Sequence, residues 1–177
     1  TILIYWIAED GGLTVYAADK LIAQARILAA EYRRSMGKPL PGISSEIAEH
    51  DAVKLLGLHP CAEGEAGYDA VDPAREDKRI QIKSRTIFDE SKSGQRIGLM
   101  KLDKDWDSVV LVLMDEDYEP YEIYEAERED ILEFVGKSSS SRAKRGAMSV
   151  ARFKIIGRLA WTREDGVVPE VWDNQAG

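Results

Sequence analysis

Three polar residues with types and spacing suited to chemistry lie close together in the chain: Asp69, Gln81 and Lys83. Gln81 and Lys83 alternate with Ile80 and Ile82. Because successive side chains of a strand point to opposite sides, the isoleucines are predicted to face a core and the polar pair the other side. A carboxylate, a second oxygen ligand and an ammonium group are what phosphodiester hydrolysis with a hard divalent cation requires.

Two more carboxylates, Glu46 and Glu49, lie upstream on a helix predicted from residues 46 to 56. They share a stripe of helical spacing with the apolar Val53 and Leu56. Acids in such a stripe are costly when they face the interior without partners. Both could instead serve only as partners of the helix dipole, just as Asp69 could be an ordinary turn residue.

The elements around these residues follow from periodicity and from Gly, Pro and Ser punctuation. Helices are expected over 14–35, 46–56 and 126–135, and strands over 68–71, 79–85, 108–114 and 118–124. The unbroken apolar run at 108–114 is typical of a central strand covered on both faces. Segments 91–98 and 138–141 are expected to be loops, and 149–161 is compatible with helix or strand. Together they indicate an α/β fold.

The length of 177 residues and an apolar content of 44% indicate a single domain. We expect an N-terminal helical extension over 1–42, a core over 43–135, and a basic loop with a C-terminal segment over 136–177. One cysteine and no recognisable leader favour a reducing cytoplasm. The apolar stretch 2–8 is too short to span a bilayer, so it is predicted to be a buried strand or helix start, with no membrane role.

The net charge of −8 is unevenly distributed. Residues 137–158 contain seven basic and no acidic side chains, and residues 78–104 contain eight basic and three acidic ones. Such segregation favours a nucleic-acid partner, although a solvated basic loop or an acidic protein partner would also explain it. The expected contacts to nucleic-acid phosphates are Arg85, Lys92, Arg96, Arg142, Lys144 and Arg145.

The order of these features resembles the PD-(D/E)xK superfamily of restriction-endonuclease-like nucleases. The resemblance covers about residues 43 to 125: a helix acid, then Asp69, then Gln81-Ile82-Lys83, then an apolar strand. It implies a restriction-endonuclease-like αβββαβ core, in which helices flank a mixed central sheet, with an extra N-terminal helix here. It also implies a DNA endonuclease that hydrolyses phosphodiester bonds with Mg²⁺ or Mn²⁺. Such an enzyme could act as a homodimer.

The resemblance assigns a role to each candidate residue by its position. The catalytic set is Glu46, Asp69, Gln81 and Lys83, with Glu49 as the rival for the helix acid. The metal would be held by Asp69, Gln81, the Ile82 carbonyl and Glu46 or Glu49. Lys83 would orient water or stabilise developing charge.

Two positions depart from the family pattern. Tyr68 stands where the family has proline, which contributes backbone shape and no ligand atom. Gln81 stands where the family has an acid, and its carboxamide oxygen can coordinate a hard cation but brings no charge. The alternative is therefore a catalytically inactive protein of the same fold that binds nucleic acid or a protein partner.

Overall fold

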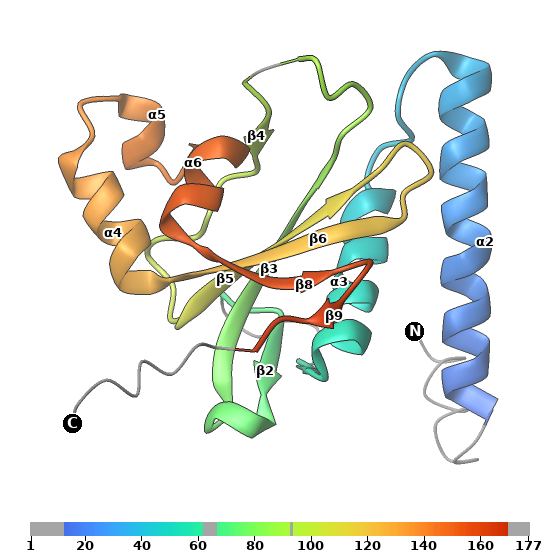
Figure 1. The fold of residues 1–177 in the computed structure, drawn as a ribbon, viewed down its shortest axis with the longest axis horizontal. Helices are drawn as coiled ribbons and strands as arrows, with labels where there is room; N and C mark the ends of the chain where they lie inside the picture. The colour runs from blue at the N-terminus through green and yellow to red at the C-terminus, as the bar shows by residue number, and fades with distance from the viewer. Residues whose placement is uncertain (1–12, 62–66, 93, 170–177) are drawn as a thin grey trace.

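A computed structural model describes residues 13–61, 67–92 and 94–169 (Figure 1). The strand or helix start predicted at residues 2–8 lies outside these ranges. Within them the protein is α/β, with a mixed seven-stranded sheet, a small two-stranded sheet and several helices. No helix in the described part of the chain is long and apolar enough to cross a membrane.

The large sheet has the strand order β1-β2-β3-β5-β6-β8-β9. Its strands are β1 His59–Pro60, β2 Ala70–Asp72, β3 Lys78–Thr86, β5 Ser108–Met114, β6 Pro120–Glu127, β8 Arg158–Thr162 and β9 Gly166–Val167. Only β3 and β5 pair in parallel, and every other neighbouring pair is antiparallel. All seven residues of β5 are buried, which confirms the central strand predicted at 108–114.

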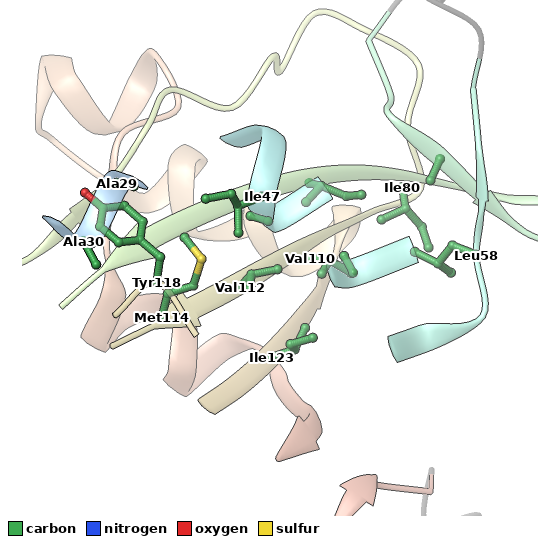
Figure 2. Packing of buried hydrophobic residues seen from close by; sticks show 14 residues of the cluster. Ala29, Ala30, Ile47, Leu58, Ile80, Val110, Val112, Met114, Tyr118 and Ile123 are labelled. Atoms are coloured by element: carbon green, nitrogen blue, oxygen red, sulfur yellow. The ribbon is translucent and has the colours of Figure 1, made fainter. Parts of the chain in front are cut away.

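One face of the sheet is covered by α2 Leu13–Met36 and α3 Ile43–Leu56. Ile47 of α3 packs with Ile80 of β3 and Val110 of β5 in this core (Figure 2). The Arg26 guanidinium of α2 donates two hydrogen bonds, of 2.9 and 2.7 Å, to the Asp51 carboxylate of α3. The long helix predicted at 14–35 is therefore tied to the core through α3.

The opposite face is covered by α4 Arg128–Lys137 and α6 Val150–Ile156, with α5 Ser141–Lys144 between them in the chain (Figure 1). The ambiguous segment 149–161 contains both a helix and a strand: α6 ends at Ile156, and β8 begins at Arg158 after the single residue Gly157. The predicted loop at 138–141 is mostly confirmed, although Ser141 begins α5.

The core strands differ in one respect from the expected αβββαβ order. Strand β6 follows β5 as an antiparallel neighbour before α4 begins, and β8 comes after the helices. The coarser expectation of a mixed sheet flanked by helices is confirmed.

The predicted loop at 91–98 contains a short strand, β4 Arg96–Ile97, that pairs antiparallel with β7 Met148–Ser149. Gly146 makes this approach possible, since its φ is +91° and a Cβ there would lie 2.5 Å from the Met100 carbonyl oxygen. The pairing brings the two basic segments of the sequence side by side.

Candidate functional site

The candidate site begins where β2 stops covering the edge of β3. Asp69 immediately precedes β2, and its backbone N–H donates to the Ile80 carbonyl at 2.8 Å. The Asp69 carboxylate oxygen Oδ2 accepts a 2.6 Å hydrogen bond from the Ile82 N–H. A side chain thus replaces the strand partner at this point, and the bond fixes the carboxylate against the middle of β3.

The Ile82 carbonyl lies on the same side of β3 as its N–H. In an extended strand both polar groups of one residue point to the same neighbour. Because the Ile82 N–H points to Asp69, its carbonyl oxygen also points past the end of β2. This orientation suits the metal-ligand role predicted for the Ile82 carbonyl.

A cavity of about 330 Å³, here called the Lys83 cavity, lies between α3 and this edge of β3. Its polar lining includes Glu49, Asp69, Gln81, the Ile82 segment, Lys83 and Lys101. Glu46 does not line it; this exposed residue borders a neighbouring cavity of about 350 Å³ that Glu49 and Asp69 also line. Geometry therefore favours Glu49 over Glu46 as the acid that α3 contributes.

Two ionisable groups of the Lys83 cavity have shifted pKa values. Burial, together with the nearby carboxylates of Asp69 and Glu46, raises the pKa of Glu49 to about 7. Burial lowers the pKa of Lys83, and the Lys101 ammonium adds to that lowering against the attraction of Asp69. Ionisable groups with shifted pKa values in a cleft, here Glu49 and Lys83, are typical of functional sites.

Gln81 is buried, with only 2% of its surface exposed. Its amide nitrogen donates to the Gly67 carbonyl at 3.2 Å, and its amide oxygen accepts from the Lys101 N–H at 3.2 Å. The side chain thus joins the segment before Asp69 to the loop that carries Lys101. Gln81 therefore does not lie on an open face of the sheet, because that loop covers β3 there.

Lys101 lines the site although no pattern in the sequence predicted it there. It belongs to the basic segment 78–104, but no strand or helix periodicity fixes its position. The hydrogen bond from its backbone to Gln81 brings it to the same cavity as Lys83. Only the need of a buried Gln81 for a backbone donor could have pointed to the loop that carries Lys101.

None of the six predicted phosphate contacts lines the Lys83 cavity. Arg85 follows Lys83 on β3 and donates to the Gln95 amide oxygen at 2.9 and 2.7 Å. Lys92 and Arg96 are exposed, as are Arg142 and Lys144 of α5 and Arg145 directly after that helix. Since β4 pairs with β7, these exposed cations belong to adjoining segments.

The donors of the Lys83 cavity fit a hard divalent cation in kind. Asp69 and Glu49 provide two carboxylates and Ile82 a carbonyl, all of them oxygen ligands. In the described part of the chain, no group of three His, Cys, Asp or Glu side chains is placed to hold a metal ion.

Comparison with protein-family models and with curated proteins gave no match.

Proposed function

We propose that the protein is a Mg²⁺-dependent DNA endonuclease, with Mn²⁺ able to replace Mg²⁺. The observation that carries the proposal is the convergence of Glu49, Asp69 and Lys83 on one cavity at the uncovered edge of β3. Glu49 comes from a helix, Asp69 from the residue before a strand, and Lys83 from the next strand. This arrangement also supports a restriction-endonuclease-like core, despite the additional strand β6.

The chain's own groups would have separate tasks in hydrolysis. Asp69, Glu49 and the Ile82 carbonyl would hold the divalent cation, which when bound neutralises phosphate charge and acidifies water. Lys83 would orient the attacking water and stabilise charge on the phosphate oxygens. The water oxygen would lose a proton as it bonds to phosphorus, one ester P–O bond would break, and the leaving oxygen would take up a proton, so that one proton passes in net from the water to the leaving group.

Gln81 has a positioning role in this proposal. Both ends of its amide are engaged by backbone groups, so its side chain sets where Lys101 and Gly67 lie. Lys101 then supplies a second ammonium group facing the substrate phosphate.

The alternative is a catalytically inactive protein of the same fold that binds nucleic acid or a protein partner. The specific observation in its favour is that backbone groups engage both ends of the Gln81 amide. Because Gln81 is also uncharged, the cavity has one acid fewer than the family pattern requires. Such a protein would retain DNA without cutting it.

Plasmid and single-stranded DNA incubated with the protein and Mg²⁺ or Mn²⁺, and in parallel with EDTA, test the proposal. Asp69→Asn retains an acceptor for the Ile82 N–H, and Lys83→Met retains the length of the side chain. Each should reduce metal-dependent cleavage at least about 100-fold while DNA binding in EDTA persists. Cleavage that survives both substitutions, or that does not depend on metal, would refute the nuclease.

A further inference from the structure

A second cavity of about 270 Å³, here called the Thr86 cavity, continues along β3 from the Lys83 cavity. Its polar lining is Ser44 at the start of α3 together with Ser84, Arg85 and Thr86 of β3. Ser84 lines both cavities, so they adjoin. Because α3 runs antiparallel to β3, the two elements form the walls of one groove that passes from Glu49 toward Ser44.

The edge of β3 in this groove has backbone donors without a strand to receive them. The Ile87 N–H donates to the Met114 carbonyl of β5 at 2.8 Å, so odd-numbered residues of β3 direct their polar groups toward β5. Ser84 and Thr86 therefore direct theirs to the opposite side, and among the described residues the pairing of β3 with β2 ends at Ile80. Their N–H groups face the groove edge.

The start of α3 adds further donors. Gly42 precedes the helix with a φ of +80° and provides no side chain to cap it. The Ser45 hydroxyl donates to the Gly42 carbonyl, at 3.3 Å, and is therefore not a cap for the first-turn N–H groups. Such a helix start carries partial positive charge and attracts anions.

An independent observation on a buried side chain also points to a ligand site in this cavity. Thr86 is only 9% exposed, and its hydroxyl oxygen is buried without a hydrogen-bond partner in the described structure. It is the one buried side-chain polar atom in that position among the described residues. A buried hydroxyl without a partner is costly unless something that binds there completes its hydrogen bonding.

We propose that the Thr86 cavity binds the phosphate adjacent to the one cleaved in the Lys83 cavity, so that a DNA strand follows the edge of β3. This inference rests on the proposed function and identifies the path of its substrate. The two cavities are centred about two residues apart along β3, which is about 7 Å in a strand. The Thr86 hydroxyl, the edge N–H groups and the start of α3 would all donate to the phosphate oxygens.

The first test measures binding of a fluorescein-labelled single-stranded deoxyoligonucleotide in EDTA, by anisotropy. Thr86→Val removes the hydroxyl and keeps the shape, so we expect binding to weaken about fivefold. We expect urea stability to be unchanged or higher, because the hydroxyl has no partner to lose. A clear loss of stability would reveal a structural hydrogen bond and would overturn the proposal.

The second test introduces a repelling charge. Ser44→Glu places a carboxylate in the cavity at a helix position that favours acids, so the protein should fold and bind the oligonucleotide at least about tenfold more weakly. Gln24→Glu adds the same charge on the exposed surface of α2 and should change binding less than about twofold. Equal effects of the two substitutions would overturn the proposal.

A substrate with one uncharged methylphosphonate beside the cut links the cavity to cleavage. The wild type should cut it about fivefold more slowly, and Thr86→Val should show little additional loss. Binding that responds to Ser44 and Thr86 without any cleavage would support the cavity and refute the nuclease. Normal cleavage and binding in both variants would refute the cavity and leave the nuclease intact.

Discussion

Charged side chains near the start of strand β3 form salt bridges, whereas those near its middle and far end line a cavity without them in the described structure. At its first residues, a buried carboxylate, Glu125 of β6, lies among basic side chains that neutralise it. Toward its other end, Glu49, Asp69, Lys83 and Lys101 gather around one cavity. No salt bridge joins any of these four to another residue in the described structure.

Glu125 is only 3% exposed, yet it remains the centre of a satisfied network. Its carboxylate accepts from the Ser108 hydroxyl at 2.6 Å, from Arg158 at 2.8 Å and from Arg75 at 3.0 Å. Burial opposes ionisation, but the hydrogen bonds from Arg75 and Ser108 prevail and lower the pKa of Glu125. Charge at this end holds four strands together.

Glu49 has the opposite pKa shift, raised to about 7, because burial and two neighbouring carboxylates both disfavour its charge. A protein that needed this region only for stability would pair these acids with cations, as it does around Glu125. This contrast with Glu125 supports the proposal that the Lys83 cavity binds a charged ligand, because its acids form no salt bridge among the described residues. In the proposed function, a divalent cation and a phosphate would be the partners of these charges.

The largest expected effect concerns stability at the neutralised end. Glu125→Ala leaves three basic side chains around an empty position, so we expect the free energy of unfolding to fall by about 3–5 kcal/mol. Glu49→Ala should cost less than about 1 kcal/mol or stabilise the protein, because it removes repulsion between carboxylates. Urea denaturation of both variants at pH 7 measures the difference, and equal losses would contradict the comparison.

Next in size is the effect on cleavage of the acids of α3. Glu49→Gln should reduce metal-dependent DNA cleavage about 10- to 100-fold, because Glu49 shares the Lys83 cavity with Asp69 and Lys83. Glu46→Gln is the matched control and should change the rate less than about threefold, since this exposed residue borders only the neighbouring cavity. The reverse result would make Glu46 the helix acid.

The sequence was sufficient to predict the parts of this molecule that depend on local pattern. The apolar strand at 108–114 and the helix that ends before Gly57 follow from periodicity and punctuation, and Asp69 and Lys83, singled out by type and spacing, do line one cavity. The role of Gln81 does not, because alternation predicts which side a residue faces and not whether a distant loop covers that side. The Glu125 network likewise joins β6, β8 and the 3-10 turn Pro73–Arg75, which no local pattern relates.

Acidification should reduce the contribution of the Glu125 salt bridges to the free energy of unfolding. The pKa of Glu125 is lowered in the folded protein, so its contribution to stability is present above its ordinary value of 4.5 and is lost as the pH falls through the folded pKa. We therefore expect the stability difference between the wild type and Glu125→Gln to be full at pH 7 and to shrink below pH 4.5. Urea midpoints at a series of pH values measure it; a difference that persists in acid would contradict the assignment.

The smallest expected effect concerns Gln81, whose side chain lines the Lys83 cavity but, like that of Glu125, has hydrogen-bond partners. Gln81→Glu keeps an acceptor for the Lys101 N–H but loses the donor to the Gly67 carbonyl. We expect a stability loss of about 1 kcal/mol, with no decrease in the Mg²⁺ concentration needed for half-maximal cleavage. A metal ligand would behave differently.

If Gln81 coordinates the cation, its replacement by glutamate adds a negative charge to the ligand set, and half-maximal cleavage should occur at lower Mg²⁺. Gln81→Met separates the cases further, because it removes both hydrogen bonds while it fills a similar volume. A positioning role predicts that Gln81→Met impairs cleavage through a displaced Lys101, and that Lys101→Met adds little to it. Independent, multiplying losses from the two substitutions would instead place Gln81 on the metal.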